Sequence, residues 1–297
     1  MQSVSRLNIL HLVGFKSKEY FRLLKFRLSL TVVFSAGMGY ILGGGKSIDW
    51  TLFGIFALAG MCLTGASNIL NQVYEKDSDK LMDRTKSRPV PTGNVSVPEA
   101  IFLASVLGAL SIFLFNEFFN FKTAVLGFSS LVLYAFAYTP LKTKTPLAVF
   151  VGAIPGALPP MIGWIAATNK FGWEPGILFG IQFFWQLPHY WAIAWVLDED
   201  YQKAGIRLLP NAGGRTSETA FQIMIYTLFL IPLGFMPYFL GMTGITSAIV
   251  TLIAGILFLA QTFYLMKECT KKAALLIMFG SFLYLPIVQI AFVLDKV

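Results

Sequence analysis

The sequence has little charge, almost no histidine and almost no cysteine. Charged residues make up 13% of its 297 residues, about half of the share that a soluble globular domain carries. The two cysteines, Cys62 and Cys269, supply neither a disulfide framework nor the spacing of a zinc site. These shortages exclude a soluble fold, a disulfide-stabilised fold and a zinc domain.

Apolar residues fill the chain instead. They make up 56% of the sequence, and the mean hydropathy is +0.68. Apolar runs recur at a length of about 20 residues, which crosses a bilayer as a helix. We therefore expect an all-α integral membrane protein with about nine transmembrane helices around a central cavity. The expected spans are residues 28–44, 51–71, 98–116, 122–139, 147–167, 174–197, 219–239, 244–266 and 273–294.

The positive charges follow the expected topology. All but four of the 23 Lys and Arg residues lie in the N-terminal segment or in every second loop, the exceptions being Lys46, Lys122, Lys170 and Lys296. By the positive-inside rule, the N-terminus and the long charged loops are cytoplasmic. Membrane topology thus explains the net charge of +8. We expect the lipid bilayer as a partner and no nucleic acid, because no basic run interleaved with aromatic residues stands on a soluble domain.

The segments outside the spans are too short to fold separately. We therefore expect residues 1–297 to form a single membrane-embedded domain. Residues 1–27 mix Leu, Val and Phe with Lys and Arg, which predicts a basic amphipathic segment at the membrane surface. Because no transit-like extension precedes it, we expect a bacterial cytoplasmic (inner) membrane and not a mitochondrial one.

A polar stripe closes the second span. Asn71, Glu75 and Asp79 are spaced by four residues, which places them on one face of a helix, and Asp83 would extend that face. Such oxygen ligands suit Mg²⁺, which takes one or two carboxylates and completes its shell with phosphate oxygens and water. The alternative is a solvated helix end of mixed charge. Against it, Asn71 and Glu75 continue directly from an apolar helix, where ionisable groups are costly.

Basic residues follow the stripe at once. Arg84 and Arg88 suit bidentate recognition of phosphate, and Lys86 adds a point charge. The stiff turn at residues 88–93, which holds two prolines, would fix the bases relative to the acids. Carboxylates with a metal beside fixed cations predict a site that binds a diphosphate and lets it leave.

This combination of acids and bases resembles the first signature of the UbiA-type intramembrane prenyltransferases. The matching residues are Asn71-x3-Glu75-x3-Asp79 and Met82-x-Arg84-Thr85-x2-Arg88-Pro89. The wider superfamily more often has Asp in the middle position of the stripe. Glu there, with the Met-x-Arg-Thr-x2-Arg-Pro continuation, resembles the heme O synthase (protoheme farnesyltransferase) branch. The resemblance covers roughly residues 20–215.

A second acidic group closes the sixth span on the same side of the membrane. If spans 2 and 6 pack together, Asp198, Glu199 and Asp200 would face the first stripe across a cavity mouth, where a second metal would bridge a diphosphate. The alternative is again a solvated helix end. The motif Asp-Tyr-x2-Ala-Gly at residues 200–205 resembles the same branch, whereas the wider superfamily carries a second Asp-x3-Asp here. Asp200 is therefore the expected second metal ligand, with Asp198 and Glu199 as further candidates.

Two further residues are candidates through the same resemblance. His189 belongs to a Trp-Gln-x-Pro-His motif inside the sixth span; it is either a hydrogen-bonded packing residue or an axial ligand to the iron of a heme substrate. Lys142 belongs to a Tyr-Thr-x-Leu-Lys element and is an expected diphosphate contact. Prolines and glycines at residues 152–160 predict either a broken helix that lines a cavity or close helix packing.

The resemblance implies transfer of a farnesyl group from farnesyl diphosphate to a vinyl group of protoheme, which gives heme O. Mg²⁺ would assist departure of the diphosphate, and a downstream heme-modifying membrane enzyme would be a partner. The implied metal ligands are Asn71, Glu75, Asp79 and Asp200, and the implied diphosphate contacts are Arg84, Arg88 and Lys142. One alternative is an aromatic acceptor such as a quinone precursor. A transporter is another, but it would need polar groups deep within several spans.

Overall fold

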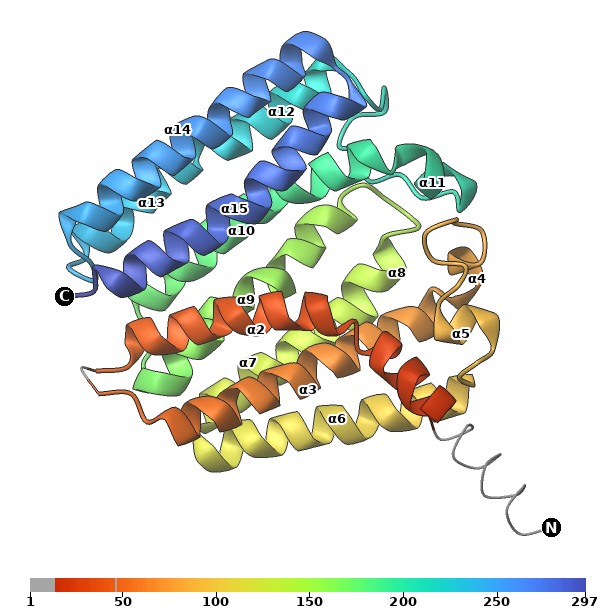
Figure 1. Ribbon diagram of the computed structural model, residues 1–297, viewed down its shortest axis with the longest axis horizontal. Helices are drawn as coiled ribbons and strands as arrows, with labels where there is room; N and C mark the ends of the chain where they lie inside the picture. The colour runs from red at the N-terminus through yellow and green to blue at the C-terminus, as the bar shows by residue number, and fades with distance from the viewer. Residues whose placement is uncertain (1–13, 46) are drawn as a thin grey trace.

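The computed structural model describes residues 14–45 and 47–297, which form α-helices and no strand (Figure 1). This confirms the all-α prediction. The long helices pack side by side: α2 (Phe26–Gly43), α3 (Trp50–Tyr74), α6 (Val97–Phe118), α7 (Phe121–Val132), α9 (Ala148–Thr168), α10 (Trp173–Val196), α12 (Ser217–Leu228), α13 (Leu230–Phe239), α14 (Ile245–Glu268) and α15 (Lys271–Leu294). The short elements are α4 (Lys76–Asp79), α5 (Pro89–Thr92), the π-helix η1 (Leu133–Tyr138), α8 (Thr139–Leu141) and α11 (Asp198–Lys203).

Eight helical stretches of the described chain are long and apolar enough to cross a membrane. Two of these are composite, since Phe121–Leu141 joins α7, η1 and α8, and Ser217–Phe239 joins α12 and α13. The predicted span 174–197 corresponds to α10, which has 24 residues but is not among the eight. Its buried Gln182, Gln186 and His189 reduce its apolar character. The count of nine spans therefore remains a prediction.

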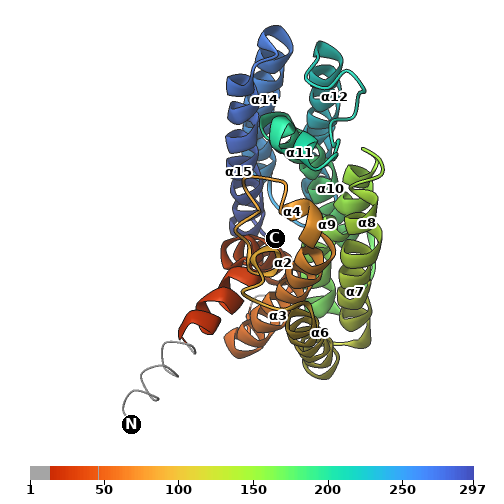
Figure 2. The same ribbon diagram turned by 90° about the vertical axis from the view of Figure 1, so that its right-hand side faces the viewer.

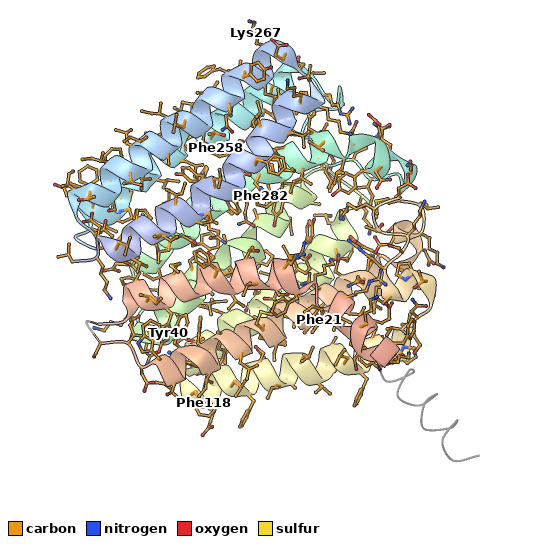
Figure 3. The ribbon with its side chains drawn as sticks, viewed as in Figure 1. Phe21, Tyr40, Phe118, Phe258, Lys267 and Phe282 are labelled. Atoms are coloured by element: carbon orange, nitrogen blue, oxygen red, sulfur yellow. The ribbon has the colours of Figure 1, made fainter. Side chains whose placement is uncertain are left out.

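The outer surface of the bundle is rich in aromatic side chains. Phe102, Phe121, Trp173 and Phe239 are each at least 70% exposed. Figure 3 shows Phe118 on the outer face of α6, with its side chain outside the bundle. Apolar surface of this extent fits contact with lipid and not with water.

Polar residues immediately before the apolar runs fix several helix starts. The carboxylate of Asp49 accepts hydrogen bonds from the first backbone amides of α3. Ser96 and Glu99 form a capping box at the start of α6. Thr216 and Thr270 cap α12 and α15 in the same manner. These side chains satisfy amides that the helix itself leaves unpaired.

Helix α9 contradicts the expectation of a broken fifth span, because it runs without interruption from Ala148 to Thr168. Pro159 and Pro160 have no amide hydrogen for the carbonyls of Pro155 and Gly156, four residues earlier. Neighbouring helices supply the missing donors. Ser130 Oγ donates to the Pro155 carbonyl at 3.3 Å, and Gln182 Nε2 donates to the Gly156 carbonyl at 3.1 Å.

Close packing through glycine, the other expectation for this span, is confirmed. A Cβ atom on Gly163 would lie 1.9 Å from the Ala36 carbonyl oxygen of α2. A Cβ atom on Gly39 would lie 2.0 Å from the Pro160 carbonyl oxygen. Helices α2 and α9 thus approach backbone to backbone, as small residues permit in membrane bundles.

The loops and short helices gather at one end of the bundle. Figure 1 shows α4, α5, α8 and α11 at this end, with the C-terminus at the opposite end, and Figure 2 looks onto it. The described part of the predicted amphipathic segment is helical over residues 14–23. There Glu19 and Leu23 are buried while Phe21 is 55% exposed. Residues 1–13 of that segment lie outside the described residues.

Candidate active site

The predicted polar stripe is present and buried. Helix α3 ends at Tyr74 and α4 begins at Lys76, but helical hydrogen bonds continue across the junction. The Glu75 amide donates to the Asn71 carbonyl at 2.9 Å, and the Asp79 amide donates to the Glu75 carbonyl at 2.7 Å. Asn71, Glu75 and Asp79 are 3%, 3% and 0% exposed. Three polar side chains are therefore stacked on one face, as the spacing predicts.

Two basic side chains neutralise the stripe. Lys142 Nζ lies 3.2 Å from Glu75 Oε1, and Arg88 Nη1 lies 2.6 Å from Asp79 Oδ2. Arg88 also lies 3.9 Å from Glu75 Oε2, so it spans both carboxylates. Burial opposes the charge of Lys142, but the Glu75 carboxylate outweighs it and raises the pKa of this lysine above its usual value. Lys142 is thus held as a cation beside the stripe.

A third cation comes from Lys25, a residue of the basic N-terminal segment that no sequence motif distinguishes. Its Nζ lies 3.4 Å from Asn71 Oδ1. Lys25 stands just before α2 with φ 47° and ψ 53°, a left-handed conformation that is uncommon for a residue with a side chain. Burial, with Arg88 nearby, lowers the pKa of Lys25 to about 7. A strained backbone conformation at Lys25 therefore places a weakly basic amine next to the stripe.

Asn71, Glu75 and the three cations line a polar cavity of about 190 Å³, whereas the fully buried Asp79 is not part of its lining. It is bounded by α2, α3, η1, α9, α10 and α11 together with the loops at this end of the bundle. Its lining residues are Lys25, Leu28, Asn71, Glu75, Arg84, Arg88, Tyr134, Tyr138, Lys142, Val149, Tyr190, Ile193, Tyr201 and Leu208. The lining holds four basic side chains and one carboxylate, so the cavity is suited to a strongly anionic ligand.

Tyrosines complete the lining. Tyr134 and Tyr138 lie on the π-helix η1, a local widening that often occurs at functional sites. Tyr201 of α11 stacks against two of the cations: its ring centre is 5.4 Å from Lys142 Nζ and 6.0 Å from the Arg84 guanidinium carbon. Cation–π contacts of this kind hold basic side chains in place without neutralising them. No sequence motif singled out Tyr134, whereas Tyr138 and Tyr201 fall within motifs already quoted.

The donor set fits a hard cation. Asp79 Oδ1 is fully buried and has no hydrogen-bond partner among the described residues. A buried carboxylate oxygen without a donor needs a cation or a water. Within residues 14–45 and 47–297, no group of three or more His, Cys, Asp or Glu side chains is placed to hold a metal. Mg²⁺ needs only one or two carboxylates when phosphate supplies the other oxygens.

Asp83 does not extend the stripe, and that prediction is wrong. Helix α4 ends at Asp79, so the four-residue spacing is lost before residue 83. The Asp83 side chain is 63% exposed and pairs with Lys203 and with Lys86. These two lysines lower the pKa of Asp83 to about 2. The carboxylate is thus directed to solvent and not to the cavity.

The second acidic group lies beside the first stripe but acts differently. Asp200 Oδ1 accepts a hydrogen bond from the Asp83 backbone amide at 2.8 Å, and Oδ2 accepts one from the Arg84 amide at 3.3 Å. Burial opposes these two hydrogen bonds, but they hold the pKa of Asp200 below its usual value. Asp200 is absent from the cavity lining. The two acidic ends are thus in contact through backbone amides, and not across a cavity mouth as predicted.

Asp198 and Glu199 lie further from the cavity. Arg215 Nη1 is 2.9 Å from Glu199 Oε1, and Arg215 Nε is 4.0 Å from Asp198 Oδ2. The Glu199 side chain is 75% exposed. Neither acid lines the polar cavity. Both belong to the surface of the α10–α12 connection.

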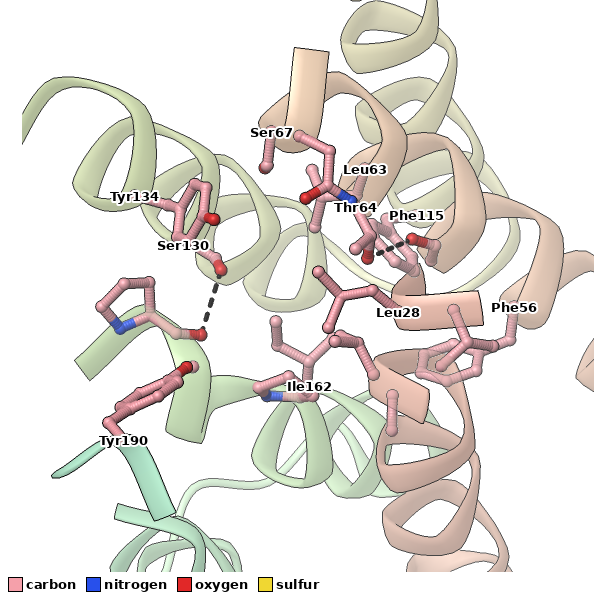
Figure 4. Close-up of a pocket in the computed structure, with 18 residues that line it drawn as sticks. Leu28, Phe56, Leu63, Thr64, Ser67, Phe115, Ser130, Tyr134, Ile162 and Tyr190 are labelled. Atoms are coloured by element: carbon pink, nitrogen blue, oxygen red, sulfur yellow. Dashed lines mark hydrogen bonds between the residues drawn. The ribbon is translucent and has the colours of Figure 1, made fainter. Parts of the chain in front are cut away.

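An apolar cavity of about 140 Å³ adjoins the polar one. Leu28, Tyr134 and Tyr190 line both cavities. In Figure 4 the two tyrosines lie on one side of the apolar cavity, and Phe56 and Phe115 lie on the other. Both phenylalanines are 1% exposed and belong to the interior of the bundle. A charged recess therefore leads to an apolar one.

His189 lies next to these cavities but not in their linings. Its neighbour Tyr190 belongs to both. The imidazole is 7% exposed, and its Nδ1 is 2.7 Å from Ser281 Oγ on α15. Its packing role, one of the two expectations, is thus present in the structure.

Comparison with known proteins identifies the family. Residues 32–285 match the UbiA prenyltransferase family. A protein named protoheme IX farnesyltransferase from Cytophaga hutchinsonii is 58% identical to this chain, and the alignment covers 94% of this chain and 98% of the relative. Another protein of that name, from Christiangramia forsetii, is 46% identical, and the alignment covers 94% of this chain and 93% of the relative.

Solved structures show the same fold. One, described as digeranylgeranylglyceryl phosphate synthase, has a TM-score of 0.79 at 20% identity and covers 94% of this chain and 98% of its own. Another, a UbiA homolog from Archaeoglobus fulgidus bound to GPP and Mg²⁺, has a TM-score of 0.64 at 17% identity. The match covers 92% of this chain and 99% of that structure's chain. The eight apolar helices and the family match mark an integral membrane protein. The chain belongs to the UbiA prenyltransferase family and is a prenyltransferase.

Proposed function

We propose that this chain transfers a farnesyl group from farnesyl diphosphate to a vinyl group of protoheme and so produces heme O. The observation that carries the proposal is the junction of a cavity lined by four basic side chains with an apolar cavity. An amphiphile with a diphosphate head and an isoprenoid tail matches that junction. The relatives named protoheme IX farnesyltransferase supply the identity of donor and acceptor.

The head group would occupy the polar cavity. Arg84 and Arg88 would bind diphosphate oxygens through their guanidinium groups, and Lys25 and Lys142 would add point charges. In the absence of a ligand, the acids of the stripe keep Arg88 and Lys142 oriented. The cations are thus preorganised around the place where negative charge grows when the donor ionises.

Asn71, Glu75 and Asp79 are the residues that would hold Mg²⁺. The unpartnered Asp79 Oδ1 supports this assignment, as does the burial of all three side chains. When bound, Mg²⁺ would neutralise charge on the departing diphosphate. Asp200, expected from the sequence to be a second metal ligand, is proposed instead to hold the loop that carries Arg84, because both of its oxygens bind that loop's amides.

The donor would react by ionisation of its C1–O bond. The bonding electron pair leaves with the diphosphate, and an allylic cation remains. The apolar cavity would hold the isoprenoid chain and keep water away from this cation. Tyr134 and Tyr190 stand where the two cavities meet, so their ring faces would stabilise the positive carbon.

The acceptor step completes the balance of atoms and electrons. The π electrons of the vinyl group form the new bond to C1, which leaves a cation on the carbon next to the porphyrin ring. Water adds there and loses a proton, so the porphyrin carries a hydroxyethylfarnesyl group. A downstream heme-modifying membrane enzyme would receive this lipophilic product.

The same geometry supports two proposals about placement. The basic side chains that line the cavity come from the end of the bundle where α4, α5, α8 and α11 lie, which supports, by the positive-inside rule, an active site toward the cytoplasm of a bacterial inner membrane. Residues 1–297 would work as one domain, because α2, α3, η1, α9, α10 and α11 all contribute to the cavity lining.

The direct test is a product analysis. Purified protein in detergent is incubated with protoheme, farnesyl diphosphate and Mg²⁺, and heme products are separated and weighed by mass spectrometry. The proposal predicts a Mg²⁺-dependent heme species heavier by one farnesyl group and one hydroxyl group. Unchanged heme together with prenylation of a quinone-type aromatic would overturn the choice of acceptor, and failure to release diphosphate with any acceptor would overturn the reaction.

A further inference from the structure

The backbone turns sharply between the N-terminal helix of residues 14–23 and α2. Lys25 occupies this turn in its left-handed conformation, and its amide donates to the Arg22 carbonyl at 3.3 Å, three residues back instead of four. In a continuous helix, the carbonyls of Leu23 and Leu24 would accept from amides four residues further on. The turn interrupts that pattern, so both carbonyls need other donors.

Side chains of α3, with one from α2, supply these donors. Gln72 Nε2 donates to the Leu23 carbonyl at 2.9 Å. The Leu24 carbonyl accepts from Ser29 Oγ at 2.8 Å and from Asn68 Nδ2 at 3.3 Å. Asn68 Nδ2 also donates to Ser29 Oγ at 3.2 Å. Two amide side chains, one helical turn apart on α3, therefore tie down the turn that holds Lys25.

The two amide side chains are costly residues for a membrane helix. Asn68 and Gln72 are 2% and 1% exposed, and polar groups buried within an apolar helix lose their hydration. Gln72 Oε1 has no hydrogen-bond partner among the described residues, so the hydrogen bonds of this side chain come from its N–H groups alone. Gln72 lines neither the polar nor the apolar cavity. Any effect of Gln72 on a ligand must therefore pass through the turn.

We infer that Gln72 and Asn68 are positioning residues that hold the turn before α2 and so place the Lys25 amine in the polar cavity. Lys25 Nζ lines that cavity and lies 3.4 Å from Asn71 Oδ1. Asn71 stands between the two positioning residues on α3, so one helix carries both the polar stripe and the side chains that fix the cation beside it. A residue with a side chain keeps a left-handed conformation only where its surroundings impose it. The inference rests on the proposed function in one respect, because it takes a diphosphate as the ligand of the cavity.

A double-mutant cycle tests whether Gln72 acts through Lys25. Gln72→Met and Lys25→Met nearly keep the side-chain length and remove the amide and the charge, and binding of inorganic diphosphate with Mg²⁺ is measured by calorimetry in detergent. Lys25→Met should weaken binding about tenfold. Gln72→Met should weaken it about threefold to tenfold in the wild-type background and have no further effect in Lys25→Met. An equal loss in both backgrounds would overturn the inference, because a merely structural role does not depend on the Lys25 charge.

Ser111→Ala is the matched control. Ser111 Oγ of α6 is fully buried and donates to the Ala59 carbonyl of α3 at 2.8 Å, so this variant also removes a hydrogen bond from a side chain to the backbone of another helix. Ala59 lies about 20 Å along α3 from Gln72, and Ser111→Ala should bind diphosphate as wild type does. Asn68→Leu enters the same cycle as a second variant. If its loss of affinity persists in the Lys25→Met background, the positioning role is wrong.

A measurement without any ligand tests the turn itself. Glycine adopts the left-handed conformation without steric cost, whereas alanine does not, so Lys25→Gly should unfold at a higher temperature than Lys25→Ala. Gln72→Met should release the turn and reduce this difference. The reverse order of the two Lys25 variants would contradict the inference even if Gln72→Met failed to fold.

The product analysis separates this inference from the proposed function. Heme product from wild type, with equal losses of diphosphate affinity in both backgrounds of the cycle, would overturn the positioning role and leave farnesyl transfer standing. Coupled losses of affinity without any heme product would support the positioning role and overturn the choice of acceptor. Absence of diphosphate binding by wild type would overturn both.

Discussion

Two acidic segments follow α3 and α10 at the same end of this bundle, and the structure uses them differently. After α3, Glu75 and Asp79 are buried, paired with Arg88 and Lys142, and directed to the interior. After α10, Glu199 is exposed and pairs with Arg215. In composition both segments are clusters of acids beside bases. Burial, and not charge content, marks the segment that can do chemistry, because only a buried carboxylate must be compensated by a ligand or a fixed cation.

Asp200 is intermediate between the buried acids after α3 and the exposed Glu199. Its carboxylate connects the segments by accepting hydrogen bonds from the amides of Asp83 and Arg84. The second segment therefore serves the first by holding its loop. The comparison predicts that substitutions in the buried stripe reduce activity most and that substitutions in the exposed Glu199–Arg215 pair reduce it least.

Asp79→Asn should have the largest effect. It removes the buried carboxylate that we propose as a Mg²⁺ ligand and leaves Arg88 without its 2.6 Å partner. We expect turnover to fall by at least about 100-fold, measured as heme product formed per minute. An unchanged elution profile in detergent would show that the variant is folded and inserted. Wild-type turnover in a folded Asp79→Asn protein would contradict the metal assignment.

Lys25 should give the cavity a pH dependence. With a pKa of about 7, its amine is a cation below that pH and neutral above it, so attraction for a diphosphate falls as pH rises. We expect kcat/KM for farnesyl diphosphate to drop about tenfold between about pH 6 and about pH 8. Lys25→Arg keeps its charge throughout and should flatten this limb of the profile. The same drop in Lys25→Arg would assign the titration to another group.

Asp200→Asn should have a moderate effect. Asparagine keeps one carbonyl oxygen for the two amides of the loop, but the charge-assisted hydrogen bonds weaken. We expect KM for farnesyl diphosphate to rise roughly threefold to tenfold, with a smaller change in kcat. A loss as large as that of Asp79→Asn would show that Asp200 acts on the substrate or the metal directly.

Glu199→Gln should have the smallest effect. The side chain is 75% exposed, and surface ion pairs such as the one with Arg215 contribute little. Activity within about twofold of wild type is expected in the same product assay. A large loss would mean that the second segment does more than hold the loop of the first.

Much of this arrangement could be predicted from the sequence. Runs of apolar residues identified the helical bundle, and the four-residue spacing placed Asn71, Glu75 and Asp79 on one face. The prediction failed at Asp83, because the chain leaves the helix at Asp79 and spacing arguments end with the helix. For residues 152–160 the sequence left a broken helix and close packing open, and α9 is continuous because neighbouring helices supply the donors that Pro159 and Pro160 lack.

Other features depend on contacts between distant segments, which spacing cannot reveal. Lys25 was one of many basic residues in a charged segment, and only the approach of α2 to α3 brings it to Asn71. The engagement of Asp200 with backbone amides has no signal in side-chain identity. The hydrogen bond between His189 and Ser281 joins residues that are 92 positions apart.

The most direct test of the central claim is binding of farnesyl diphosphate to wild type, Asp79→Asn and Glu199→Gln, measured by calorimetry with and without Mg²⁺ and without any acceptor. The buried stripe predicts that Mg²⁺ tightens binding in wild type and in Glu199→Gln but not in Asp79→Asn. Equal Mg²⁺ dependence in all three proteins would contradict the assignment of the metal and the diphosphate to this stripe.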